Sequence, residues 1–239
     1  GTMGQVLTKC VADDEELQLV AGVSPKHHDV NNQFNTYSSF AEVKEDADVV
    51  IDFSNPLALD DILDYCLKTK TPVVLATTGY NDEEMEKIYQ ASKQIPVFLS
   101  FNMSLGVNIL LKLVKEAAKN LNNFDIEIIE KHHNKKVDSP SGTAVMIANA
   151  VKEIREQSEF IYGRHGRTGK RQQNEVGIHA VRGGTIVGEH SAIFAGNDEI
   201  LEINHSARSK NVFAEGAIAA AKYLVNQQPG FYNMDDMLG

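Results

Sequence analysis

The sequence predicts an α/β protein in which a Rossmann-like dinucleotide-binding domain is joined to an α+β domain with an open mixed sheet. Three observations support this prediction. Strands and helices alternate over roughly the first hundred residues, glycines stand at the start of the first predicted helix, and three strand-like segments follow one another near the end. The 239 residues are 42% hydrophobic, which is enough to bury one large core or two smaller ones.

Charge and composition exclude some classes of partner. The formal net charge of -10 argues against binding to nucleic acid or to an anionic membrane, because both would repel the surface at long range. No apolar segment approaches transmembrane length, and no signal peptide is visible. The only cysteines, Cys10 and Cys66, lie in partly apolar segments with helical patterns, which favours free thiols in a reducing cytoplasm.

The start of the chain is interpreted as the second half of a Gly-x-Gly-x-x-Gly turn. Gly1 and Gly4 would be its last two glycines, and a helical pattern follows from Met3 to Ala12. A strand precedes this turn in dinucleotide-binding folds. We therefore expect the first strand of the fold to be missing from the given sequence.

Alternating strands and helices extend this domain. Strands are expected at residues 17–23, 47–53, 72–76 and 95–100, with helices at 40–43 and 56–68 and after Asn81. Asn81 and Glu84 form a capping-box pattern, in which each side chain accepts a hydrogen bond from the backbone of the other. A polar segment at residues 27–37 separates the first two strands.

The loops that follow these strands predict a cofactor site, because ligands of parallel sheets lie beyond the carboxyl ends of the strands. The candidate contacts are Gly1, Thr2, Met3, Gly4, Phe53, Ser54, Ala76, Thr77, Thr78, Gly79, Ser100, Phe101, Asn102 and Met103. For the two threonines, ordinary turn chemistry is the alternative.

Ser24 and Lys26 are further cofactor candidates. The second strand of an NAD-binding fold usually ends in Asp or Glu, which binds the ribose 2′-OH, whereas Ser24 stands here. The Ser24 hydroxyl and the Lys26 ammonium can both donate hydrogen bonds to a 2′-phosphate. We therefore expect NADPH to be used at least as well as NADH, although a solvated loop would also explain Lys26.

Most of the candidate chemistry lies in a strand-to-helix loop. Alternating apolar residues predict a strand over 124–129 with one buried face, and apolar residues at helical spacing predict a helix over 143–154. Ser141 or Thr143 would cap that helix. Because a helix start attracts anions and Lys135 and Lys136 precede it, a carboxylate or phosphate would fit there.

His132 and His133 stand beside this predicted anion site. Imidazole exchanges a proton near neutral pH, so the pair indicates an acidic substrate whose reaction requires a proton. A solvated surface segment is the alternative. A metal site is less favoured, because the neighbouring lysines repel cations and no Cys or helical Glu-x-x-His arrangement supports it.

The remaining segments predict the second domain. A long helix begins near Leu105, a glycine-rich basic loop covers residues 162–171, and strands are expected at 176–182, 185–194 and 199–206. Gly183-Gly184 predicts a two-residue hairpin, so these three strands are expected to be sequential and antiparallel. A helix at 212–225 would return to the first domain.

The segment Glu-x-His-His-x-x-Lys-x-Asp-x-Pro-Ser-Gly-Thr-Ala, residues 130–144, resembles the signature of dihydrodipicolinate reductases of bacterial lysine and diaminopimelate synthesis. Asp52-Phe53-Ser54 and Thr77-Thr78-Gly79 are similar to that family's cofactor-facing loops, and residues 230–238 are similar to its C-terminal segment. The resemblance spans essentially the whole chain.

This resemblance implies a homotetramer that reduces 4-hydroxy-tetrahydrodipicolinate, a small dicarboxylate, to tetrahydrodipicolinate with NADPH or NADH. Residues 1–103 and 213–239 would bind the cofactor, and residues 104–212 would bind the substrate and form the subunit contacts. His132 would be the general acid/base and Lys136 the proton donor or its electrostatic partner. The substrate-binding residues would be His133, Ser141, Gly142 and Thr143.

Two other functions fit the sequence. Another two-domain NAD(P)-dependent dehydrogenase of amino-acid metabolism would share the nucleotide fold and differ in its substrate. A nucleotide-sensing regulatory module would bind the cofactor without turnover.

Overall fold

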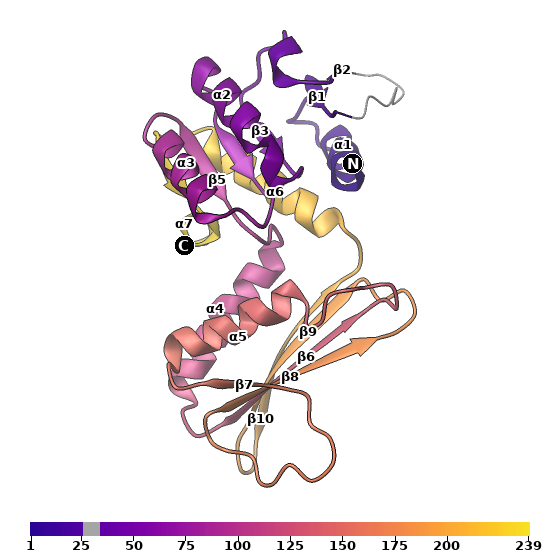
Figure 1. The fold of residues 1–239 in the computed structure, drawn as a ribbon, viewed down its shortest axis with the longest axis vertical. Coiled ribbons are helices and arrows are strands. Elements are labelled where there is room, and N and C mark those ends of the chain that lie inside the picture. Colours follow the sequence, from indigo (N-terminus) through magenta and orange to yellow (C-terminus); the bar gives the residue numbers. More distant parts are fainter. Residues whose placement is uncertain (26–33) are drawn as a thin grey trace. The chain divides into compact units, whose positions relative to one another are not determined.

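The structure, a computed structural model, describes residues 1–25 and 34–239 and divides into two compact units (Figure 1). The first unit comprises Gly1–Ser104 and Lys210–Gly239, and the second comprises Leu105–Ser209. The domain boundaries expected from the sequence, after residue 103 and before residue 213, fall close to these limits.

The first unit contains two parallel sheets. One pairs β1 (Ala21–Val23) with β2 (Asn35–Tyr37), and the other has the order β11-β5-β4-β3, formed by β3 (Val50–Asp52), β4 (Val73–Leu75), β5 (Pro96–Leu99) and β11 (Gly230–Tyr232). Every pairing is parallel, which confirms the Rossmann-like class. Among the described residues no pairing joins the two sheets, and the strand expected before Gly1 stays a prediction.

Helices surround these strands, and their limits follow local sequence signals. They are α1 (Thr2–Ala12), the 3₁₀ turns η1 (Phe40–Glu42) and η2 (Pro56–Ala58), α2 (Leu59–Thr69), α3 (Asp82–Ser92), α6 (Asn211–Leu224) and α7 (Met234–Leu238). The predicted capping box of α3 is confirmed: Asn81 Oδ1 accepts from the Glu84 N–H at 2.9 Å, and Glu84 Oε2 accepts from the Asn81 N–H at 2.8 Å. Both bonds satisfy N–H groups that a helix start leaves unpaired.

Small residues let α6 pack closely against its neighbours in the first unit. Its buried positions include Ala214, Gly216 and Ala217. A Cβ atom at Gly216 would overlap the carbonyl oxygen of Met103, so only glycine fits there without a backbone shift. Met103, one of the cofactor candidates, is 2% exposed, and its packing against α6 accounts for this burial.

We expect Gly216→Ala to lower the free energy of unfolding by about 1–3 kcal/mol, because the added methyl group must displace a backbone carbonyl. Urea unfolding of this variant and of Glu215→Ala, a change at the exposed neighbour on the same helix, tests the prediction. The Glu215 variant should remain within about 0.5 kcal/mol of the parent protein. Equal stability of the two variants would show that α6 shifts freely and that the close approach is unimportant.

In the second unit two helices cover one face of a mixed sheet (Figure 1). The helices are α4 (Leu105–Asn120) and α5 (Gly142–Ile154), and the sheet has the order β10-β9-β6-β8-β7, formed by β6 (Asp125–His132), β7 (Glu159–Tyr162), β8 (Glu175–Arg182), β9 (Gly188–Ala195) and β10 (Ile200–Ala207). This arrangement confirms the predicted open mixed sheet.

Two details of the predicted topology are wrong. β8 and β9 do not form a hairpin at Gly183-Gly184, because β6 lies between them and pairs with β8 in parallel and with β9 antiparallel. Only β9 and β10 among the three expected strands are antiparallel neighbours. The segment before Gly163 also supplies a strand, β7, which extends the sheet beyond β8 and was not expected from the sequence.

β6 confirms the predicted alternation and continues it. Ile126 and Ile128 are buried in the core formed with α4 and α5, and the next inward residues of the same strand are Glu130 and His132. Since successive side chains of a strand point to opposite faces, all four lie on one face. The strand runs three residues beyond the predicted end at Ile129 and places the polar side chains of Glu130 and His132 at the border of an apolar core.

Candidate active site

The Glu130 carboxylate is the centre of the candidate site in the second unit. Its side chain is completely buried, and His132 Nδ1 lies 2.7 Å from its Oε2 atom. Arg182, on the neighbouring strand β8, donates to both carboxylate oxygens at 2.7 Å. Burial alone would raise the pKa of Glu130, but hydrogen bonds from Arg182, His132 and the backbone of Ser141 outweigh it and lower the pKa. The carboxylate is therefore ionised near neutral pH.

The start of α5 is attached to the same carboxylate. The Ser141 N–H donates to Glu130 Oε1 at 2.9 Å. The Ser141 hydroxyl caps the helix by accepting from the Ala144 N–H at 3.2 Å, so Ser141, and not Thr143, is the cap. Gly142 is exposed and Thr143 half-buried in the first turn. The hydrogen bond from Ser141 to Glu130 brings the start of α5, with Ser141, Gly142 and Thr143, next to the carboxylate that also contacts His132.

His190 on β9 completes the buried part of the cluster. Its Nε2 atom lies 2.8 Å from Ser141 Oγ, and its ring meets that of His132 edge to face with centroids 5.2 Å apart. Burial, followed by the nearby His132, lowers the pKa of His190 to about 4. His190 is consequently neutral at physiological pH.

Lys136, the cation predicted beside the anion site, lies in the loop between β6 and α5. Lys136 Nζ donates to Asp138 Oδ1 at 2.8 Å, and its side chain is 20% exposed. Arg182 also donates to the Asp138 carbonyl oxygen at 2.8 Å, which ties the loop to β8. Lys135 is exposed and His133 half-buried. Lys136 is therefore held by the chain, whereas its neighbour Lys135 is solvated.

The candidate cofactor residues of the first unit lie where the strands end. The Ala76 N–H donates to Asp52 O and the Ser100 N–H to Leu75 O, so the loops after β3, β4 and β5 begin at the same level. Ser54 and Thr78 are exposed there. The Thr77 hydroxyl is buried, and no group of the described chain is aligned to hydrogen-bond it, the nearby Tyr80 hydroxyl included. An unsatisfied hydroxyl at this edge fits a ligand with hydrogen-bonding groups.

The other cofactor candidates divide into three groups. Gly1 is the N-cap of α1, and Thr2, Met3 and Gly4 form its first turn. Phe101 is 52% exposed, whereas Asn102 and Met103 are buried. Ser24 follows β1 and donates its N–H to Tyr37 O at 2.9 Å, and Lys26 lies outside the described residues.

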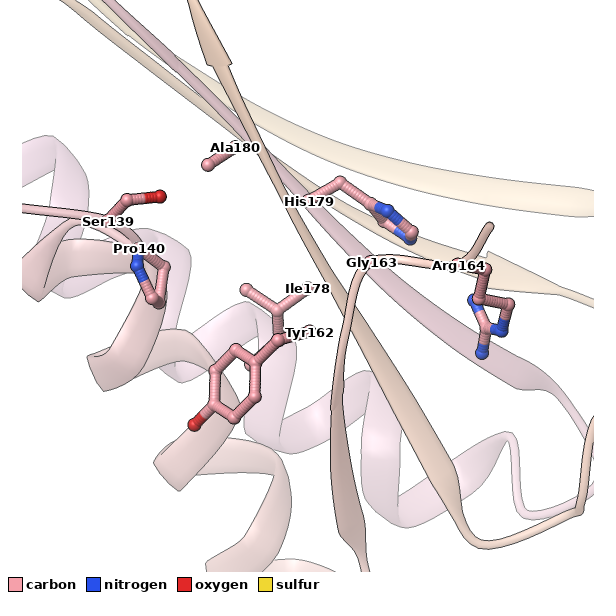
Figure 2. Close-up of a pocket in the computed structure, with 8 residues that line it drawn as sticks. All are labelled: Ser139, Pro140, Tyr162, Gly163, Arg164, Ile178, His179 and Ala180. Atoms are coloured by element: carbon pink, nitrogen blue, oxygen red, sulfur yellow. The ribbon is translucent and has the colours of Figure 1, made fainter. Parts of the chain in front are cut away.

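A surface hollow of about 360 Å³ in the second unit is separate from these groups. It is lined by Ser139, Pro140, Tyr162, Gly163, Arg164, Ile178, His179 and Ala180. Figure 2 shows Ala180, Ser139 and Pro140 on one side of the β8 ribbon and His179 and Arg164 on the other. None of the candidate catalytic or substrate-binding residues lines it, so we do not place the substrate there.

The described residues contain no cluster of three or more His, Cys, Asp or Glu side chains suited to a metal ion. In the same part of the chain no helix is long and apolar enough to cross a membrane.

Sequence reasoning missed three residues of the cluster as site residues, namely Glu130, Arg182 and His190. Their signal was present but indirect: each stands at an inward position of a strand that also carries apolar residues on its inward face. A polar side chain in such a pattern requires a partner when buried. The partners themselves could not be identified without the strand order.

The sequence matches a known enzyme family over nearly its whole length. Residues 1–103 match the family described as "Dihydrodipicolinate reductase, N-terminus", and residues 106–238 match "Dihydrodipicolinate reductase, C-terminus". These two regions correspond closely to the two compact units.

Named relatives agree with this match. The chain is 53% identical over 239 residues to a 4-hydroxy-tetrahydrodipicolinate reductase of Caldanaerobacter subterraneus subsp. tengcongensis, covering 100% of this chain and 94% of the relative. It is 48% identical over 240 residues to the enzyme of that name from Clostridium tetani, covering 100% and 93%.

A solved structure shares the fold. The dipicolinate-bound dihydrodipicolinate reductase from Paenisporosarcina sp. TG-14 superimposes with a TM-score of 0.80 at 23% identity, covering 98% of this chain and 94% of that one.

Proposed function

We propose that this chain, which belongs to the dihydrodipicolinate reductase family, reduces 4-hydroxy-tetrahydrodipicolinate to tetrahydrodipicolinate with NADPH or NADH. In this reaction the substrate gains a hydride and a proton and loses water. The first unit would bind the pyridine nucleotide, and the second unit would bind the substrate. The bound nucleotide supplies the hydride, and the residues of the chain supply binding, orientation and the proton.

Binding of the cofactor would use the edge where the parallel strands end. The N–H groups at the start of α1, around Gly1 and Gly4, would bind the phosphates, since a helix start carries partial positive charge. The loops that begin at Phe53, Ala76 and Ser100 would contact the rest of the cofactor. The unsatisfied Thr77 hydroxyl supports a polar ligand at this edge.

Binding of a carboxylate of the substrate would use the start of α5. Ser141 would shape this site as the buried cap of the helix, the backbone around Gly142 and Thr143 would offer hydrogen bonds, and His133 and the Lys136 ammonium would add polar contacts. Cationic groups beside the ring also favour hydride addition, because they stabilise the negative charge that develops on the ring nitrogen.

Proton transfer would use His132. Its Nδ1 atom faces the ionised Glu130 carboxylate at 2.7 Å, which orients the ring, and Lys136 supports the developing charge. One observation is the main support for this proposal. In a chain of this family, His132 and the start of α5, which Ser141 caps, both contact the Glu130 carboxylate.

The assay that tests the proposal follows NAD(P)H absorbance with freshly generated 4-hydroxy-tetrahydrodipicolinate. We expect oxidation that depends on both the substrate and the protein. Oxidation only with a different imine or keto acid would favour another dehydrogenase of amino-acid metabolism. Nucleotide binding with a flat absorbance trace would favour a regulatory module.

For the choice between cofactors, we propose that NADPH is used at least as well as NADH, because Ser24 replaces the acidic residue expected at the end of β1. Ser24→Asp should shift the ratio of the two kcat/KM values toward NADH, since a carboxylate repels a 2′-phosphate. Ser24→Asn, a neutral residue of similar size to Asp, is the matched control. A strong preference for NADH in the parent protein that neither variant changes would contradict a role of Ser24 in reading the ribose.

We also propose that the protein is a cytoplasmic homotetramer assembled through the sheet of the second unit. Exposed apolar side chains on that sheet, among them Val181, Ile200 and Leu201, support a subunit contact. Light scattering of the purified protein measures the subunit number, and a monomer would contradict the proposal.

A further inference from the structure

The Glu130 carboxylate is hydrogen-bonded to both halves of the candidate site. Its Oε2 atom meets His132 Nδ1 at 2.7 Å, and its Oε1 atom accepts from the Ser141 N–H at 2.9 Å. Arg182 donates one hydrogen bond of 2.7 Å to each of the two carboxylate oxygens. Because the carboxylate is fully buried, no solvent competes for these bonds.

The charge on Glu130 determines which nitrogen of His132 carries the proton. An ionised carboxylate only accepts hydrogen bonds, so His132 Nδ1 must be the donor. In the neutral ring the lone pair then lies on Nε2. That atom faces β9, where a Cβ atom at Gly188 would stand 3.1 Å away. The absence of a side chain at Gly188 leaves space next to the nitrogen that exchanges protons.

The same carboxylate fixes the start of α5. With its N–H bound to Glu130, Ser141 is held in the extended conformation that an N-cap requires, and its hydroxyl lies between the Ala144 N–H and His190 Nε2. A movement of Glu130 would therefore displace both the imidazole of His132 and the helix start that would bind the substrate carboxylate.

We propose that Glu130, held by Arg182, is a positioning residue that aligns the proton-exchanging His132 with the carboxylate-binding start of α5 and sets the Nδ1–H tautomer of His132. This inference rests on the proposed function. It adds a role for two residues that would not touch substrate or cofactor.

The opposite face of β6 offers a matched control. Glu127 also accepts from arginine, with Arg164 Nη1 at 2.8 Å, and lies 2.7 Å from a histidine nitrogen, His179 Nε2. The two glutamates thus share their strand and their kinds of partner. Only Glu130 faces His132 and Ser141.

The first test determines the tautomer of His132 in the unmodified protein. Long-range ¹H–¹⁵N correlation spectra of neutral histidines, assigned by the signals lost in His132→Gln, distinguish the two forms. We expect a protonated Nδ1 and a bare Nε2. A neutral His132 with its proton on Nε2 would overturn the proposal, and this result requires neither substrate nor a stable variant of Glu130.

The second test compares Glu130→Gln with Glu127→Gln. A glutamine at position 130 has one acceptor and one donor group, so it cannot accept from Arg182, His132 and Ser141 together. We expect kcat to fall by about tenfold to 10⁴-fold, the range seen when a carboxylate that orients a metal-bound or a catalytic histidine is lost, with a higher KM for the substrate and an unchanged Kd for the nucleotide. Glu127→Gln should retain the parent kcat.

Equal kcat values for the two folded variants would overturn the proposal. If the parent protein itself fails to oxidise NAD(P)H with the substrate, the proposed function is wrong, while the tautomer measurement still decides whether Glu130 orients His132.

Discussion

Replacing His132 with glutamine is expected to lower kcat by about 10²–10⁴-fold, the contribution of a general acid/base to a chemical step, which is the role we propose for His132. Glutamine retains a hydrogen-bonding group but cannot exchange a proton near neutral pH. The KM for the substrate should change less than kcat, since the substitution leaves the start of α5, the proposed carboxylate-binding site, intact. Steady-state kinetics with saturating nucleotide measure both constants.

His133→Gln is the control for this prediction. His133 is half-buried and its proposed role is to bind substrate, so its replacement should raise KM and leave kcat nearly intact. If His133→Gln lowered kcat and His132→Gln raised only KM, the two roles would have to be exchanged.

Lys136→Ala should lower kcat/KM by about a hundredfold, because a desolvated charge-assisted contact contributes about 1.5–3 kcal/mol and more when it acts mainly in the transition state. The Lys136 side chain is 20% exposed, and its ammonium forms an ion pair with Asp138. The Kd for NADPH should not change, as measured by fluorescence titration.

The adjacent Lys135 is exposed, so Lys135→Ala is the matched control for loss of one positive charge in the same loop. Its kcat/KM should stay within about twofold of the parent value, since exposed charges contribute little to a contact. An equal loss in both variants would indicate long-range attraction of the substrate, and near-parental efficiency of Lys136→Ala would remove Lys136 from the site.

The sequence predicts local features of this fold well, because they depend on neighbouring residues. The Asn81 capping box and the buried face of β6 are both confirmed. The pairing of β8 with β6 was missed, because a Gly-Gly pair between two strands favours a hairpin and no local signal announces that an earlier strand will insert between them. β2 and β11 were missed because they lie in polar or Pro-Gly segments, whereas the equally short β1, β3 and β4 lie in apolar segments that predict a strand.

Prediction of the candidate site from the sequence is limited in the same way. The residues of the segment from His132 to Thr143 could be grouped from the sequence, because they are contiguous and resemble a known signature. Arg182 and His190 could not be added, since the strand order alone brings them to Glu130. Buried polar residues require partners, but the requirement does not identify them.

The central place of β6 in its sheet also has a consequence for synthesis on the ribosome. Both neighbours of β6 come later in the chain, and 52 residues separate Glu130 from Arg182. Until β8 and β9 have been translated, the apolar side chains Ile126 and Ile128 lack the strands that flank them in the finished sheet. Pairing over such separations is slow and leaves nascent chains prone to aggregation. The segment that forms the centre of the site thus depends on partners that are translated later, and we expect a chaperone that shields β6 during translation to raise the yield of folded protein.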